Sequence, residues 1–112
     1  MTHPRKDLDA LIHSPVRFSI LAALAHVESA DFRFLADLVE LSDSSLSQAL
    51  TALADAGLVE VTKEAAGRRT RTWVRLTDHG RDAFQQHLRT LERIARTGAV
   101  EPAAAPADGG AA

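Results

Sequence analysis

DSSLSQALTALADAGLVEVTKEAAGRRTRTWVRL, residues 43–76, is the stretch that decides the fold. Its first part, 43–56, places Leu46, Leu50 and Leu53 on one side of a helix. The part that follows is rich in Val, Thr and Trp, which predicts strands over 58–62 and 70–76 around an Ala65-Ala66-Gly67 turn. Four arginines crowd into this predicted hairpin: Arg68, Arg69, Arg71 and Arg75. A helix with a polar outer face is therefore followed directly by a basic hairpin.

Positive charge is concentrated in the hairpin, although the chain as a whole has a formal net charge of −2. Residues 31–60 carry six acids and one base, whereas residues 63–75 carry five bases and one acid. The distribution of charge says more about nucleic-acid binding than the total does. Nucleic acid therefore stays among the candidate partners.

Helices are predicted on both sides of this stretch. Apolar residues at helical spacing indicate helices over 5–13, 15–27, 32–40 and 78–96. In the last of these, Phe84, Leu88, Leu91 and Ala95 have the spacing of a coiled-coil-like seam. The predicted fold class is thus α+β, mainly helical with one small β-hairpin.

Three residue types mark the expected helix ends. Ser42 is a good N-cap for the helix 43–56, and Gly57 stands where a left-handed residue ends a helix. Thr77 is expected to cap the last helix, and Gly80 in its first turn costs less than a glycine in mid-helix.

Composition indicates one globular domain over residues 1–97. The chain has 112 residues, of which 46% are hydrophobic, and the Ala-, Pro- and Gly-rich tail 98–112 is expected to be disordered. The sequence contains neither an apolar run near 18 residues nor a signal-peptide core, so we expect a cytoplasmic protein without membrane contact. The absence of cysteine excludes disulfides and thiolate metal sites.

No arrangement of residues predicts catalysis. Serines are many, but none lies in a nucleophile elbow, and no loop can cradle a phosphate. The five histidines are scattered without an i, i+4 pair, so solvated helix faces explain them better than a metal site does. We therefore expect neither an enzyme nor a cofactor or metal.

The outward face of helix 43–56 and the hairpin arginines could together bind DNA. Glutamine can bond adenine through two hydrogen bonds, and serine or threonine can reach bases or phosphates. Since this helix has no Lys or Arg, the hairpin must supply most of the electrostatic affinity. Arg75 is expected to be structural. The predicted DNA contacts are Ser44, Ser45, Gln48, Thr51, Arg68, Arg69 and Arg71.

Three segments resemble the MarR-type winged-helix transcriptional regulators, in the small subgroup that is little more than the DNA-binding domain. They are LIHSPVRFSILAAL (11–24), LSDSSLSQALTALADAGLVEV (41–61) and GRRTRTWVRLTDHGRDAF (67–84). The segment order and the LT-x-x-G-R junction are the specific part. ArsR-type metal repressors are similar in the middle segment, but this chain lacks their cysteines.

The resemblance implies a winged helix-turn-helix with dimerisation helices at both ends. It implies a homodimer, in most relatives a repressor, that binds double-stranded DNA at an inverted repeat in the bacterial nucleoid; an unidentified small-molecule effector is compatible with it. Recognition helix 43–56 would enter the major groove, and wing 59–76 would lie on the backbone or minor groove. The expected dimer interface comprises Leu8, Leu11, Ile12, Phe84, Leu88, Leu91 and Ile94.

Two alternatives remain open at this point. The apolar residues at the two ends could pack within the chain instead of across a dimer. The acidic stretch 31–60 is also compatible with a winged-helix module that binds a protein rather than DNA.

Overall fold

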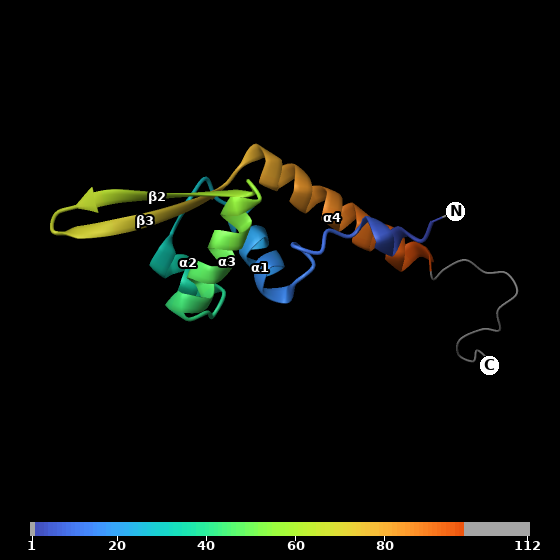
Figure 1. The fold of residues 1–112 in the computed structure, drawn as a ribbon, viewed down its shortest axis with the longest axis horizontal. Helices are drawn as coiled ribbons and strands as arrows, with labels where there is room; N and C mark the ends of the chain where they lie inside the picture. The colour runs from blue at the N-terminus through green and yellow to red at the C-terminus, as the bar shows by residue number, and fades with distance from the viewer. Residues whose placement is uncertain (1, 98–112) are drawn as a thin grey trace, which may run out of the picture.

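The computed structural model describes residues 2–97. Its elements are the 3₁₀ helix η1 (Pro4–Asp7), helices α1 (Pro15–Leu24), α2 (Phe32–Leu38), α3 (Asp43–Asp55) and α4 (Asp78–Thr97), and strands β1 (Ala30–Asp31), β2 (Val59–Ala66) and β3 (Arg69–Leu76). Helices α1, α2 and α3 form a body from which the β2–β3 hairpin projects on one side and α4 on the other (Figure 1). The molecule is accordingly elongated, with extents of 67 × 28 × 21 Å. The tail 98–112 lies outside the described residues.

The core joins the helical body to the base of the hairpin. Ile20, Leu21 and Leu24 of α1 meet the inward leucines of α3, and Val74 and Leu76 of β3 complete the cluster. The predicted inward side of α3 is confirmed, because Leu46, Leu50 and Leu53 are all buried. Burying a leucine-sized side chain stabilises a fold by about 1.5–3 kcal/mol, so this cluster holds the helices in place.

Helices α2 and α3 are joined by a tight connection. The amide of Leu41 donates to the Ala36 carbonyl at 3.0 Å, and Glu40 takes a left-handed φ of 56° to allow this. The Ser42 hydroxyl then accepts a hydrogen bond from the Ser45 amide at 3.1 Å and caps α3, as predicted. At the other end of α3, Gly57 has a φ of 77°, which confirms its expected left-handed role.

The sheet has the order β1-β3-β2, with all pairs antiparallel. Strands β2 and β3 pair as far as Ala66 and Arg69, so the loop is Gly67-Arg68 and the predicted Ala65-Ala66-Gly67 turn is displaced. Gly67 has a φ of 67°, which a two-residue loop with glycine first requires. Strand β1 was not predicted, because two residues carry no periodicity.

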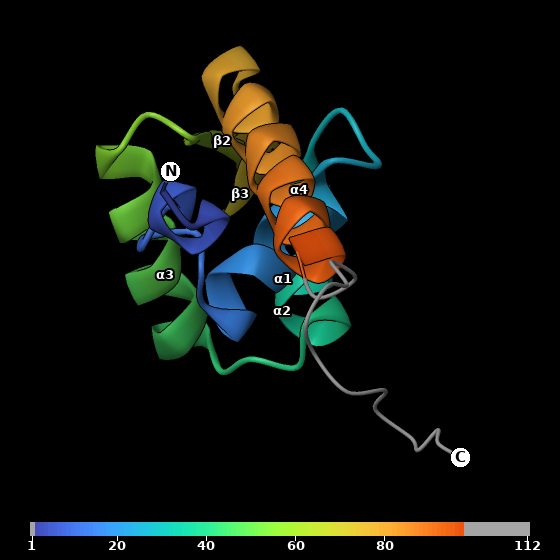
Figure 2. The same ribbon diagram turned by 90° about the vertical axis from the view of Figure 1, so that its right-hand side faces the viewer.

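The N-terminal segment differs from its predicted helix over 5–13. Only Pro4–Asp7 is helical, and a turn follows in which the Asp9 carboxylate accepts a hydrogen bond from the Leu11 amide at 2.9 Å. Such side-chain-to-backbone bonds compete with helix formation. The segment lies beside α4, and Arg93 on α4 pairs with Asp7 at 2.7 Å (Figure 2).

The inward face of α4 only partly matches the predicted seam, because Phe84 is buried but Leu88 is not. Its buried residues are Gly80, Phe84, His87 and Thr90, whereas Leu88 is 40% exposed. Thr90 can be buried because its hydroxyl donates to the Gln86 carbonyl at 3.0 Å within the same helix. The rotation leaves leucine on the outside of α4.

The start of α4 is tied to the end of α3. The Thr77 hydroxyl accepts from the Gly80 amide at 2.8 Å, which confirms Thr77 as the cap, and donates to the Gly57 carbonyl at 2.7 Å.

Within residues 2–97, every helix is too short or too polar to cross a membrane.

Candidate nucleic-acid interface

Helix α3 presents a continuous polar face to solvent. Ser44, Ser45, Ser47, Gln48 and Thr51 are all exposed, as expected once the leucines face inward. The Thr51 hydroxyl donates to the Ser47 carbonyl at 2.9 Å, so its oxygen can still accept a hydrogen bond. In the described part of the chain, the side chains of Ser45 and Gln48 make no hydrogen bond. These two are therefore available to an outside partner.

The start of α3 is held by an arginine from α2. Nη2 of Arg33 lies 2.8 Å from both carboxylate oxygens of Asp43, and Nη1 lies 3.9 Å from Asp37. This forked contact orients the first turn of α3 and offsets the charge of Asp43. Arg33 is thus committed within the chain and serves the interface by positioning α3.

The hairpin register divides the basic residues between two faces. Side chains alternate along a strand, so Arg71, Trp73 and Arg75 share one face of the hairpin. Lys63, Val61 and Thr72 are on the other face, which borders α3. The three strand arginines Arg69, Arg71 and Arg75 therefore share one face, and Lys63 is the base on the face toward α3.

Arg71 and Arg75 already have acidic partners. Arg75 Nε lies 2.7 Å from Oε1 of Glu60 across the hairpin, consistent with its expected structural role. Arg71 Nε lies 3.7 Å from Oδ1 of Asp31, and its guanidinium stands 5.2 Å from the centre of the Trp73 ring. The predicted DNA contact Arg71 therefore belongs to a network within the chain.

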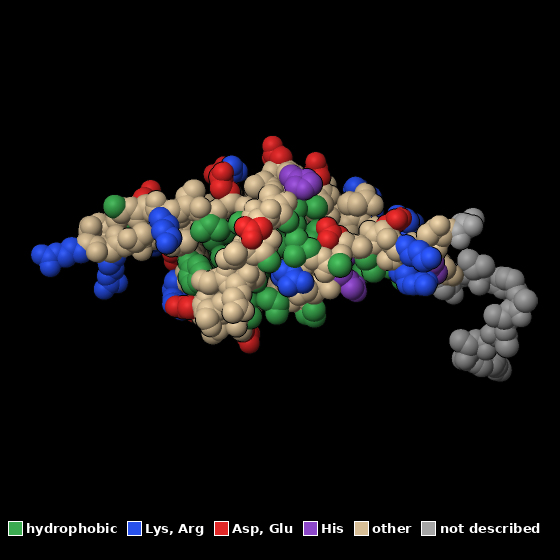
Figure 3. Space-filling view, in the orientation of Figure 1, with side chains coloured by type: hydrophobic (Ala, Val, Ile, Leu, Met, Phe, Trp, Pro, Cys, Tyr) green, Lys and Arg blue, Asp and Glu red, His purple; other side chains and the backbone are tan. Residues whose placement is uncertain are grey.

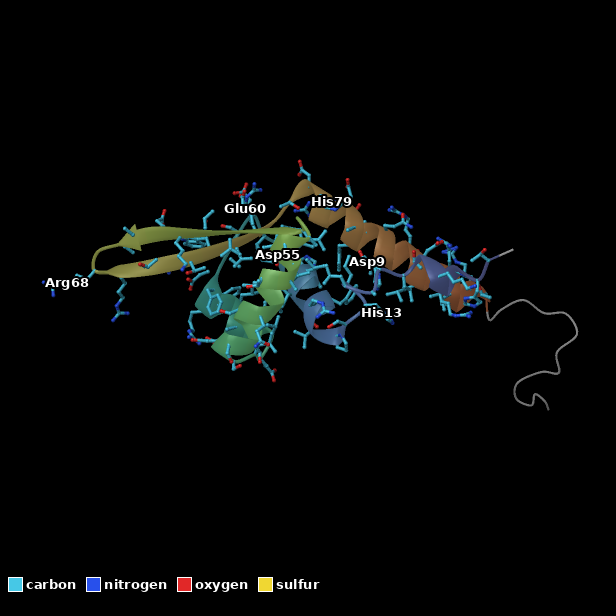
Figure 4. All side chains as sticks on the ribbon, viewed as in Figure 1. Asp9, His13, Asp55, Glu60, Arg68 and His79 are labelled. Atoms are coloured by element: carbon cyan, nitrogen blue, oxygen red, sulfur yellow. The ribbon has the colours of Figure 1, made fainter. Side chains whose placement is uncertain are left out.

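Arg68 and Arg69 remain as the exposed cations at the end of the hairpin. Neither forms an ion pair with any residue among 2–97, and Arg68 extends outward from the loop (Figure 4). The space-filling view shows basic side chains reaching beyond the hairpin end (Figure 3). The unpaired positive charge of the wing is thus concentrated at its tip.

A groove of about 520 Å³ separates α3 from the hairpin. Ser47 and Thr51 line it from α3, and Lys63 and Thr72 line it from the strands. Lys63 is exposed and was missing from the predicted contacts. Only the strand register reveals that this lysine faces the recognition helix, because a shift of one residue would turn it to the opposite side.

The predicted dimer residues divide by burial. Ile12 is fully buried and Phe84 is 9% exposed, so both belong to the core of the chain and are removed from the expected interface. The reason is the rotation of α4 and the turn at Asp9, which direct both side chains inward. The others retain exposed surface: Leu8, Leu11, Leu88, Leu91 and Ile94.

A pair of histidines lies away from the polar face of α3. Nδ1 of His13 is 3.4 Å from Nε2 of His87, and Nδ1 of His87 is buried without a partner among the described residues. Burial lowers the pKa of His87, His13 lowers it further, and Asp9 acts in the opposite direction. The sequence gives no signal for this pair, because His13 and His87 are 74 residues apart. Across residues 2–97, no cluster of three or more metal-ligating side chains is present.

Comparison with known proteins identifies a family and a relative that this chain resembles. Residues 16–95 match the model of a family described as "Winged helix DNA-binding domain". An uncharacterized protein of Methanocaldococcus jannaschii, MJ0432, is 30% identical over 86 residues, which are 77% of this chain and 94% of that protein.

Solved structures share the fold. A transcriptional regulator homologue from Pyrococcus horikoshii superimposes with a TM-score of 0.81 at 25% identity, over 88% of this chain and 100% of that one. A MarR-family transcriptional regulator from Silicibacter pomeroyi gives a TM-score of 0.61 at 25% identity, over 97% and 71% of the two chains. With its helix-turn-helix, its hairpin and the family match over most of its length, the chain belongs to the winged-helix DNA-binding domain family and has the fold of MarR-type transcriptional regulators.

Proposed function

We propose that the protein is a transcriptional repressor that binds double-stranded DNA as a homodimer at an inverted repeat. Helix α3 enters the major groove, where Gln48 and Ser45 contact base edges. The tip arginines Arg68 and Arg69 contact phosphates or the adjacent minor groove. Lys63 contacts the DNA backbone between helix α3 and the wing tip. The observation that carries the proposal is the pairing of an unbonded polar helix face with unpaired cations at the wing tip.

The homodimer follows from the apolar surface left at the two ends of the chain. Leu88 is 40% exposed on the outer face of α4, and Leu8 and Leu11 retain surface in the N-terminal segment, whose helix η1 contacts α4. A small domain gains stability when such residues are covered. A two-fold dimer would present its recognition helices to half-sites about 34–36 Å apart.

A salt titration of DNA binding tests the role of the wing. The chain is mixed with the duplex upstream of its own gene, and the dissociation constant is measured by fluorescence anisotropy at several salt concentrations. Each phosphate contact contributes a slope of about −0.9 in log K against log [salt], so the double variant Arg68→Ala/Arg69→Ala should lose about 1.8. Arg5→Ala, which removes one exposed cation from η1 at the far end of the molecule, is the control and should leave the slope unchanged.

Base reading by α3 is tested separately. Gln48→Ala should change the preference between duplexes with little effect on the salt slope, because it removes a base contact rather than a phosphate contact. An equal loss of affinity for every duplex would contradict direct reading by Gln48. Failure of the wild-type chain to bind any duplex would instead favour a protein-interaction module.

A small-molecule effector is compatible with this function. A cavity of about 260 Å³ lies between the N-terminal segment, α1 and α4, and Phe18 and His87 line it. A ligand there would contact the elements that we propose for the dimer. Such a ligand could therefore alter the spacing of the two recognition helices.

A further inference from the structure

Asp31 stands where the helix-turn-helix meets the wing. It ends strand β1, where it pairs with Trp73 of β3, and it is also the N-cap residue of α2. Aspartate at an N-cap ordinarily accepts a hydrogen bond from the helix backbone. Here the carboxylate makes no capping hydrogen bond, and its nearest charged partner is Arg71. One residue thus belongs to the first helix of the motif and reaches toward the hairpin.

Arg71 has partners on its face of the hairpin, although its side chain stays 55% exposed. Asp31 lies 3.7 Å from its Nε, the Trp73 ring lies beneath its guanidinium, and Glu64 is its register partner on β2. Trp73 is itself oriented by a hydrogen bond from its Nε1 to Oε1 of Glu64 at 3.2 Å. Arg71 is thus held by one carboxylate, from Asp31, and by the indole of Trp73, which Glu64 orients.

The contact lies just beyond the part of the hairpin that the core holds through Val59, Val74 and Leu76. Strand β2 is exposed from Glu60 onward, and β1 pairs with β3 over two residues only. Within residues 2–97, Asp31–Arg71 is the ion pair that joins the hairpin to the rest of the domain, since Arg75–Glu60 lies inside the hairpin. This link therefore adds to the hold that the core has on the base of the wing.

Because the hairpin is long, a small tilt at its base moves its tip by a large distance. Arg68 lies five residues beyond Trp73, which at about 3.3 Å per residue is about 17 Å along the strand. A tilt of about 10° at the base would move the tip by about 3 Å, which is enough to break a phosphate contact.

We propose that Asp31 is a positioning residue for DNA binding, which anchors Arg71 and thereby sets the wing against the helix-turn-helix. Arg71 then acts as a strut and makes no phosphate contact itself. The inference rests on the proposed function, because it concerns how the wing is presented to DNA. It also assigns Arg71 a role different from that of Arg68 and Arg69.

The strut and a direct DNA contact predict opposite effects of Asp31→Asn. This variant keeps the shape of the side chain and removes its charge, which at 3.7 Å is what attracts Arg71. If Arg71 is a strut anchored by Asp31, the variant removes the anchor and DNA binding weakens. If Arg71 contacted phosphate, removal of a competing carboxylate would strengthen binding.

The experiment compares Asp31→Asn, Arg71→Ala and the double variant in the same salt titration. Each single variant should weaken binding about two- to fivefold, the range that a partly exposed ion pair supports, with an unchanged salt slope. The double variant should be no weaker than the worse single one, because both remove the same link. Asp37→Asn is the matched control: it removes one exposed acid of α2, whose contact with Arg33 is long at 3.9 Å, while Arg33 keeps both oxygens of Asp43 at 2.8 Å.

Two results would overturn the proposal. One is tighter binding by Asp31→Asn than by Asp37→Asn. The other is a loss of about 0.9 in the salt slope of Arg71→Ala, which would show that Arg71 neutralises a phosphate.

A measurement without DNA separates this proposal from the function on which it rests. Trp73 is the sole tryptophan, so its emission and its quenching by acrylamide report the network directly. Asp31→Asn should increase quenching in the isolated protein, and Asp37→Asn should not. Increased quenching in a chain that binds no duplex would support the strut and refute the DNA-binding function. Unchanged quenching in a chain that does bind DNA would refute the strut alone.

Discussion

Replacement of Gly80 by alanine gives the sharpest test of how α4 joins the rest of the fold. A Cβ built on Gly80 would lie 1.9 Å from the carbonyl oxygen of Leu58 and 2.8 Å from its carbonyl carbon. Real Cβ atoms do not approach a backbone oxygen so closely, so α4 or residue 58 must shift. The position is in the first turn of α4 and is buried.

The magnitude follows from what the shift would break. The Leu58 carbonyl accepts a hydrogen bond from the Thr77 amide at 3.0 Å, and at 3.1 Å it shares the single hydroxyl proton of Thr77 with the Gly57 carbonyl, which is closer at 2.7 Å. Forced overpacking costs about 1–3 kcal/mol, and each weakened hydrogen bond about 0.5–1.5 kcal/mol. Alanine returns less than the roughly 1 kcal/mol of helix propensity that it would return in mid-helix, because Gly80 lies in the first turn. We therefore expect Gly80→Ala to lower the free energy of unfolding by about 2 kcal/mol.

Urea unfolding followed by circular dichroism measures this change at a fixed protein concentration. In a thermal scan the same loss corresponds to about 8–16 °C. Gly67→Ala is the matched control: it makes the same substitution in the hairpin loop, where no atom lies within 4 Å but φ is 67°. Its cost should be the left-handed strain alone, about 1 kcal/mol.

The sign of the effect makes the test decisive. Helix propensity by itself predicts that alanine in α4 stabilises the protein, whereas the close approach to Leu58 predicts the reverse. A Gly80→Ala protein as stable as the wild type would show that α4 does not sit against residue 58 in this way.

Three further predictions concern other parts of the molecule. Because the pKa of His87 is lowered in the folded state, the unfolded state takes up a proton first as the pH falls. The contribution of His87 to stability should therefore be complete above about pH 6.5 and decline below it. The urea midpoint of His87→Gln should fall less between these pH values than that of the wild type, whereas the exposed control His79→Gln should fall as much as the wild type. Glu40→Gly should raise the free energy of unfolding by about 1 kcal/mol, seen as a higher urea midpoint, because glycine relieves a left-handed φ of 56°. Glu40→Ala keeps a Cβ and should give no such gain. Leu88→Glu should shift the protein toward monomer in sedimentation experiments, and an unchanged dimer would exclude the outer face of α4 from the interface.

Local patterns were sufficient for the central elements. The leucine spacing of α3, its cap at Ser42 and its end at Gly57 are properties of neighbouring residues, and the structure confirms each of them. The outward polar face of α3 followed from the same spacing. The end of the hairpin was misplaced because Ala65 and Ala66 have no strong strand preference, and pairing with β3 decides their conformation.

The two ends of the chain were harder to predict for a related reason. The N-terminal apolar spacing fits a helix, but the Asp9 turn replaces it and directs Ile12 into the core. On α4, the predicted seam of apolar residues does not include His87 and Thr90, which the structure buries. The burial of such polar groups depends on partners that are distant in sequence or on hydrogen bonds within the helix. The spacing of apolar residues therefore does not predict it.

The sequence by itself determined the helix-turn-helix, the basic hairpin and the family resemblance, because periodicity, capping and charge are carried by residues close together in the chain. Only the tertiary structure decided which arginines are available to DNA. Arg68 and Arg69 are unpaired at the tip, while Arg71 is held by Asp31 from a strand of two residues about forty positions earlier. The reason is physical: an ion pair depends on distance in space, and strand register decides which face of the hairpin each charge occupies.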